Sequence, residues 1–146
     1  MSSLRGEQRI LIVSGLISIL ISLVIGWILG IAMLENWPSH ARLRAIHLTS
    51  LEIGFMLVLF GLLVSSVSFS ARAKRWWAIL LAVGSYLFYL PAILGTIWDV
   101  AGAGWTADPR NNIIFLLGLI GTLLVSVAVP ALTWGIVVTR RQGETR

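Results

Sequence analysis

The sequence predicts an all-α integral membrane protein, a bundle of four transmembrane helices. Of its 146 residues, 58% are hydrophobic and only 12% are charged, and the mean hydropathy is +0.92. A water-soluble domain carries about a quarter charged residues, so lipid must be the main solvent here. A helix needs about 20 mainly apolar residues to cross a bilayer. Four stretches qualify within a single domain of residues 1–146: residues 10–34, 45–71, 76–98 and 112–139.

The first two helices differ in their polar content. Residues 10–34 contain no charge and are too long for the core of a signal peptide, so we expect a retained helix. Residues 45–71 contain two ionisable side chains, His47 and Glu52. Ionisable groups within a membrane helix cost about 2.5–3.5 kcal/mol on insertion scales, so each is a candidate functional residue.

The second half of the chain follows the same pattern. Residues 72–75 are predicted to form a tight basic turn, and the third helix carries Pro91, which should kink it. Residues 99–111 form the longest connection and are rich in Gly and Asp. In the fourth helix, Gly118 and Gly121 are typical of close helix packing.

The distribution of Lys and Arg predicts the orientation. Eight of these 11 residues lie near the N-terminus, in the 72–75 turn or near the C-terminus, and three lie on the other side. Cytoplasmic segments carry the excess of basic residues, so both termini are predicted to be cytoplasmic in a multi-pass inner membrane protein of bacterial type. The basic residues flank apolar runs as membrane anchors, so the net charge of +5 does not indicate a nucleic-acid partner. The absence of cysteine excludes disulfides and thiolate chemistry.

Histidine and glycine recur every seven residues around the second helix, at His40, His47, Gly54 and Gly61. Seven residues are close to two helical turns, so the four share one stripe if the helix begins early enough. An imidazole beside two glycines would leave a slot for a flat cofactor such as heme, with histidine as the iron ligand. The alternative is a hydrogen-bonded histidine and packing glycines. Ser50 completes the candidate cofactor-binding set.

Glu52, Tyr86 and Tyr89 are the candidate catalytic residues. Glu52 lies five residues after His47, about 140° around a helix, so it must face another helix or a subunit interface. It is predicted to be a proton donor, a substrate contact or an indirect partner of the cofactor, or else a polar staple between helices. The tyrosine hydroxyls would supply weak acids in an apolar pocket, or the rings would simply pack at the kink.

Residues 41–54, ARLRAIHLTSLEIG, resemble the second helix of the styrene oxide isomerases and the related hydroxylaminobenzene mutases. Both families are small membrane proteins of four helices. The shared features of this region are the basic pair Arg42 and Arg44, His47, Gly54 and the FGLL run at 60–63. The VGSY, AILG and AGAG segments at 83–86, 92–95 and 101–104 are similar to the third helix and exit loop of the mutases.

The resemblance implies a homotrimeric heme b protein in which His47 binds iron near a subunit interface. Ferric iron would act as a Lewis acid on a small hydrophobic substrate taken from the lipid bilayer, in a redox-neutral rearrangement of an epoxide to a carbonyl compound. A mutase-type rearrangement of an aryl hydroxylamine is the alternative substrate class. A non-catalytic heme protein and a small proton-coupled transporter using Glu52 are further alternatives.

The sequence departs from the family pattern at two positions. The families carry an asparagine six residues after the histidine, where this chain has Ile53. The catalytic tyrosine of the isomerases falls at Ala92. The resemblance therefore supports cofactor binding more strongly than it supports substrate positioning, and we expect a substrate other than styrene oxide.

Overall fold

The computed structural model describes residues 4–144, and the side chains of residues 4–138. This part of the chain folds into four α-helices and one short 3₁₀ helix, with no strand. Each α-helix is long and apolar enough to span a membrane, which confirms the predicted all-α, four-helix fold. The elements are α1 (Gly6–Leu34), α2 (His40–Leu63), η1 (Val64–Ser66), α3 (Ala71–Trp98) and α4 (Pro109–Glu144).

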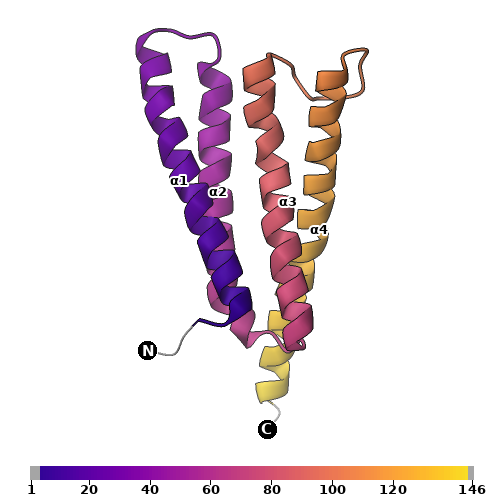
Figure 1. The fold of residues 1–146 in the computed structure, drawn as a ribbon. Coiled ribbons are helices and arrows are strands. Elements are labelled where there is room, and N and C mark those ends of the chain that lie inside the picture. The colour runs from indigo at the N-terminus through magenta and orange to yellow at the C-terminus, as the bar shows by residue number, and fades with distance from the viewer. Residues whose placement is uncertain (1–3, 145–146) are drawn as a thin grey trace.

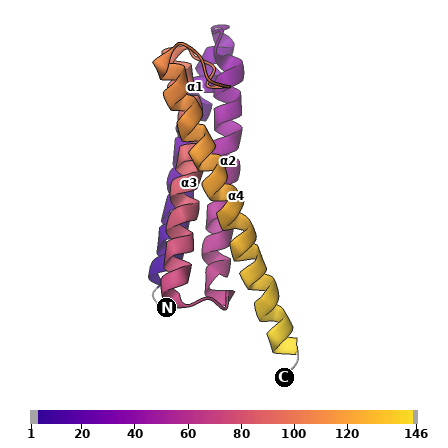
Figure 2. The same ribbon diagram turned by 90° about the vertical axis from the view of Figure 1, so that its right-hand side faces the viewer.

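The helices form two hairpins, α1 with α2 and α3 with α4 (Figure 1). The hairpins lie close together where the chain begins and ends, and they diverge toward the opposite end. We call the opposite end, which carries the connections 35–39 and 99–108, the loop end, and the other the terminal end. From the side, α4 crosses the bundle obliquely (Figure 2). Both ends of the described chain lie at the terminal end, as an even number of spans requires.

Glycines set the distance between α1 and α2. A Cβ atom on Gly54 would lie 2.6 Å from Ile19 Cγ1 and 2.9 Å from the carbonyl oxygen of Gly15. A Cβ on Gly61 would lie 2.6 Å from Ile12 Cγ1. Any larger residue would push the helices apart, so these glycines serve the close backbone packing typical of membrane helices.

Pro91 and Gly121 form a matching pair between α3 and α4. Proline has no N–H, so the carbonyl of Leu87, four residues earlier, loses its helical donor. A Cβ on Gly121 would lie 2.8 Å from that carbonyl oxygen and would also meet the backbone nitrogen of Phe88. Glycine therefore allows α4 to pack directly on the disturbed turn of α3.

The boundary between the second and third helices was predicted wrongly. α2 ends at Leu63 rather than at residue 71, and α3 starts at Ala71, so residues 72–75 are helical and do not form a turn. The reason is a helix cap, since Ser70 Oγ accepts a hydrogen bond from Ala73 N at 3.3 Å. Lys74 reaches back from the first turn, and its Nζ donates to the carbonyl of Ser65 at 3.2 Å.

The centre of the bundle is a small apolar core, built where the two hairpins meet. Its fully buried members include Leu57 of α2, Leu81 of α3 and Leu132 of α4. Many other large apolar side chains point outward, as expected where lipid is the solvent. Because α2 begins at His40, five residues earlier than predicted, all four members of the seven-residue stripe are helical.

Candidate functional site

His47 is held by one residue of the neighbouring helix. Its Nδ1 lies 2.8 Å from the carbonyl oxygen and 3.0 Å from Oγ of Ser22 in α1. Ser22 Oγ also donates to the carbonyl of His47 at 2.7 Å. A carbonyl oxygen can only accept, so Nδ1 carries the proton. In the neutral ring, Nε2 then keeps its lone pair and is the nitrogen available to a ligand.

The His47 ring lines an open, mainly apolar groove of about 470 Å³ along α1. A Cβ on Gly26 would lie 3.0 Å from Cε1 of His47, whereas a Cβ on Gly30 would meet nothing within 4 Å. These two glycines leave room beside the imidazole. The remaining lining residues of this groove, which we call the His47 groove, are Leu23, Trp27, Ile31 and Leu34.

The glycines that leave open space beside His47 lie on α1 in the structure, whereas the sequence predicted them on α2. Gly54 and Gly61 share a face with His47 as predicted, but the space beside them is filled by Ile19 and Ile12. Ser50 is fully buried, and its hydroxyl donates to the backbone carbonyls of Ile46 at 2.7 Å and His47 at 3.1 Å. None of the three lines the His47 groove, and their assignment as cofactor-binding residues stays a prediction.

Three serines spaced four residues apart on α1 each hold a polar side chain from another helix. Tyr86 donates its hydroxyl to the carbonyl of Ser14 at 2.9 Å. The hydroxyl of Tyr89 lies 3.3 Å from Ser18 Oγ, and Ser22 holds His47.

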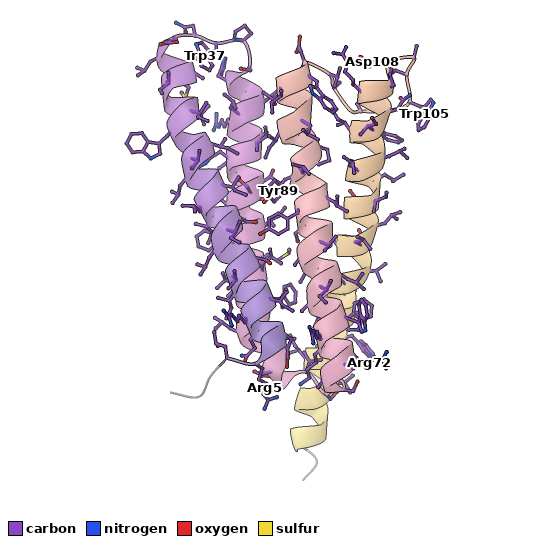
Figure 3. All side chains as sticks on the ribbon, viewed as in Figure 1. Arg5, Trp37, Arg72, Tyr89, Trp105 and Asp108 are labelled. Carbon is purple, nitrogen blue, oxygen red and sulfur yellow. The ribbon has the colours of Figure 1, made fainter. Side chains whose placement is uncertain are left out.

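Figure 3 shows Tyr89 in the space between the two hairpins. Its side chain is only 2% exposed, and its ring centroid is 5.7 Å from that of Tyr86. The two tyrosines approach α1 from α3, whereas His47 approaches it from α2. Their hydroxyls are used in helix packing and do not reach the His47 groove within one chain.

Glu52 faces away from the bundle. It is exposed and lies with Phe55, Met56 and three further apolar residues in a shallow depression on the outer face of α2. This confirms that it does not share the face of His47. No polar group of the described chain is within hydrogen-bonding distance of it, so Glu52 is not a staple between helices of one chain.

The two positions that depart from the family pattern lie apart from the groove. Ile53 is buried in the core, 9% exposed. Ala92 lines a different cavity, bounded by α2, α3 and α4. Neither position is in contact with the His47 groove.

The comparison with known families decides the classification. A family model described as styrene oxide isomerase matches residues 7–137, a range that includes parts of all four helices. The chain belongs to the styrene oxide isomerase family. The family name indicates an isomerase, and the match confirms the resemblance found from the residues around His47. No curated protein and no solved structure matches the chain.

In this family member, sequence reasoning missed the role of α1. No function was expected of Ser22, Gly26 or Gly30, although they hold His47 and shape its groove. A signal was available, because Ser14, Ser18, Ser22, Gly26 and Gly30 follow one another at intervals of four residues. Such a stripe of small residues marks a helix face that other groups approach closely.

Proposed function

We propose that this protein is a membrane isomerase that holds heme b through His47 and rearranges a small apolar epoxide to a carbonyl compound. The observation that carries the proposal is the orientation of His47. Its Nδ1 is bonded to Ser22 of α1, which leaves Nε2 for iron beside a groove kept open by Gly26 and Gly30. Membership of the styrene oxide isomerase family supports the reaction class.

The available protein ligands favour a macrocycle over a bare metal ion. Among the described residues, no three His, Cys, Asp or Glu side chains are close enough together to hold a metal. Iron at His47 would thus need its remaining ligands from a non-protein group, and the four nitrogens of heme meet that need. Arg44, exposed and three residues before His47 on α2, would pair with a heme carboxylate near the membrane surface.

Ferric heme, when bound, would supply the Lewis acid that polarises the epoxide oxygen. The reaction breaks one C–O bond, shifts a hydride to the neighbouring carbon and forms the carbonyl, so no oxidant and no water is consumed. The chain itself would hold the imidazole ring in place and exclude water from the reaction. Ser22 fixes the imidazole ring, while Leu23 and Ile31 keep water away from an opened epoxide.

A homo-oligomer, which the family resemblance implies is a trimer, would cover the open side of the groove. The His47 groove lies on the outer surface of one hairpin, and its Trp27 is 79% exposed. A flat cofactor seated there would be covered on one side only. We propose that a second copy covers the other side and brings the substrate-orienting groups, because Tyr86 and Tyr89 of the same chain are occupied by α1.

The proposed location is the inner membrane with both termini in the cytoplasm. The support is the excess of Lys and Arg at the terminal end of the bundle, which follows the positive-inside rule.

A visible absorption spectrum of detergent-purified protein tests the cofactor and its ligand together. We expect a Soret band in the wild type, its loss in His47→Ala, and its retention in the matched control His40→Ala. His40 lies on the same helix but is exposed, and its Nδ1 lies 2.8 Å from the carbonyl of Trp37 outside the groove. A wild-type protein without a Soret band that also fails to bind added heme would refute the proposal.

Turnover assays then separate the substrate classes. Because the chain departs from the family pattern at Ile53 and Ala92, an aryl hydroxylamine, the mutase substrate, must be assayed together with a panel of epoxides. A reversible Fe(III)/Fe(II) couple with a six-coordinate spectrum and no turnover of either class would instead indicate a non-catalytic heme protein. A colourless protein whose transport activity is lost in Glu52→Gln would indicate the proton-coupled transporter.

A further inference from the structure

Three basic residues lie close together where α3 begins, at the terminal end of the bundle. Arg72 and Arg75 are exposed, whereas Lys74 is buried. The first turn of this helix contains no acidic residue. Within the described chain, neither guanidinium has a hydrogen-bond or ion-pair partner, and both salt bridges lie at the loop end. We call Arg72, Lys74 and Arg75 the α3 basic cluster.

The charges of this cluster are arranged unfavourably unless an anion is present. Arg72 and Arg75 are three residues apart, so they share one side of the helix, where like charges repel each other. Cations are also disfavoured in the first turn of a helix, because the backbone dipole is positive there. A negative group bound beside the two arginines would relieve both effects.

Lys74 is an independent indication of an unpaired charge. It is only 7% exposed, and its Nζ donates to the carbonyl of Ser65 at 3.2 Å. A buried ammonium group is normally paired with an acid. The described chain supplies only this neutral oxygen, and no described carboxylate lies within 4.0 Å of the ammonium group. An anion bound at the same turn would provide the countercharge.

An exposed apolar stripe continues from the cluster along the same side of α3. Trp76, Val83 and Leu90 follow Arg72 by 4, 11 and 18 residues, which places each within about 40° of it around the helix. Their exposed fractions are 57%, 47% and 39%. Tryptophan is typical of the membrane interface. Basic, aromatic and aliphatic side chains therefore follow one another in the order of the headgroup, interface and acyl chains of a phospholipid.

We propose that the α3 basic cluster binds the phosphate group of an anionic phospholipid, whose acyl chains lie along this stripe. Arg72 and Arg75 contact the phosphate oxygens, since guanidinium groups bind phosphate through paired hydrogen bonds. The apolar stripe favours a lipid over a free phosphate ion. The site goes beyond the proposed isomerase function, because it requires neither His47 nor its groove.

Native mass spectrometry of the detergent-purified protein measures the binding. The protein is titrated with equal amounts of phosphatidylglycerol and phosphatidylcholine that carry the same acyl chains. We expect the wild type to retain phosphatidylglycerol preferentially. The double variant Arg72→Gln/Arg75→Gln should lower this preference about fivefold for each arginine removed. Equal retention of the two lipids by the wild type would refute the proposal.

The double variant Arg5→Gln/Arg9→Gln is the matched control. It removes the same charge at the same end of the bundle, but from the other hairpin, as the positions of Arg5 and Arg72 in Figure 3 show. Its lipid preference should stay close to that of the wild type. An equal loss in both double variants would indicate general attraction of anionic lipids to a basic surface, and would overturn the assigned site.

Inorganic phosphate distinguishes the lipid from a free anion. Added phosphate should displace no more phosphatidylglycerol than sodium chloride of equal ionic strength does. Complete displacement by phosphate alone would assign the cluster to a free anion and contradict the proposed lipid.

Thermal unfolding gives an independent readout. In neutral detergent, Arg72→Gln/Arg75→Gln should unfold at the wild-type temperature or above it, because two repelling charges are removed. Added phosphatidylglycerol should raise the midpoint of the wild type and of Arg5→Gln/Arg9→Gln, but not that of Arg72→Gln/Arg75→Gln. A lower midpoint of the latter in neutral detergent would show that the arginines have a partner within the protein, and would refute the proposal. None of these measurements depends on a Soret band, so this proposal and the heme proposal can fail separately.

Discussion

The carbonyl oxygen of Ser22 lies 2.8 Å from Nδ1 of His47 and joins α1 to α2 beside the open groove. Because the acceptor is a backbone atom, the contact survives any change of the Ser22 side chain that keeps the helix. The contact sets which imidazole nitrogen carries the proton, and so which one keeps a lone pair for a ligand. A residue outside the second helix thus determines what its histidine can bind.

Ser22→Ala should separate the two contacts of this residue. The variant loses the Oγ contacts to the Nδ1 and the carbonyl of His47 but keeps the backbone acceptor. We expect a Soret band like that of the wild type and a loss of stability of about 0.5–1.5 kcal/mol, measured by thermal unfolding in detergent. A colourless Ser22→Ala protein would show that Oγ, and not the carbonyl, holds the ring.

Gly26→Ala should disturb the His47 ring directly. The added Cβ would lie 3.0 Å from Cε1 and 3.1 Å from Nδ1 of His47, so the ring must shift. We expect weaker retention of heme, measured by titration of the apoprotein, with unchanged helix content. Gly6→Ala is the control for helix propensity, because nothing lies within 4 Å of its Cβ. Equal heme affinity in both variants would contradict the assigned role of Gly26.

Two buried serines should respond in opposite ways to replacement by alanine. Ser18→Ala leaves the buried hydroxyl of Tyr89 without its partner, and such a loss costs about 1–3 kcal/mol.

Ser85 is fully buried, and its Oγ has no partner within the described chain. Ser85→Ala should therefore leave the thermal midpoint unchanged or raise it. A lower midpoint in Ser85→Ala would indicate a partner supplied by water or by a second copy.

The start of α4 should lose its cap in acid. Asp108 Oδ1 accepts a hydrogen bond from Arg110 N at 2.9 Å, and its carboxylate pairs with the Arg110 guanidinium at 3.0 Å. These side-chain and backbone bonds to Arg110 hold the pKa of Asp108 below its usual value. A lowered pKa in the folded state stabilises the cap above the unfolded pKa of about 3.9, and the stabilisation is lost as pH falls through the lower folded value.

Amide hydrogen exchange of residues 108–112 measures this loss. Protection should be constant between about pH 7 and 5, after correction for intrinsic exchange, and should drop below about pH 4. Asp108→Asn should abolish the pH dependence while keeping a capping side chain. Protection that is the same at pH 7 and pH 2 in the wild type would contradict the assigned ion pair.

Much of the fold was predictable, because spanning a membrane is a local property of the chain. The lengths of the apolar stretches alone located four helices, and the family motif around His47 could be read directly from the sequence. Helix ends were harder to predict. The run at 72–75 looked like a turn because charged residues interrupt the apolar pattern, but the Ser70 cap extends α3 through it.

The sequence by itself determined that this protein is a four-helix membrane protein of one family, and that His47, Gly54 and Gly61 share a helix face. Only the tertiary structure decided what covers that face. Periodicity shows which residues lie on the same side of a helix, but it carries no information about the neighbour that packs there. α1 fills the space beside Gly54 and Gly61 and leaves it open beside His47, because Gly26 and Gly30 are the residues without side chains at that level.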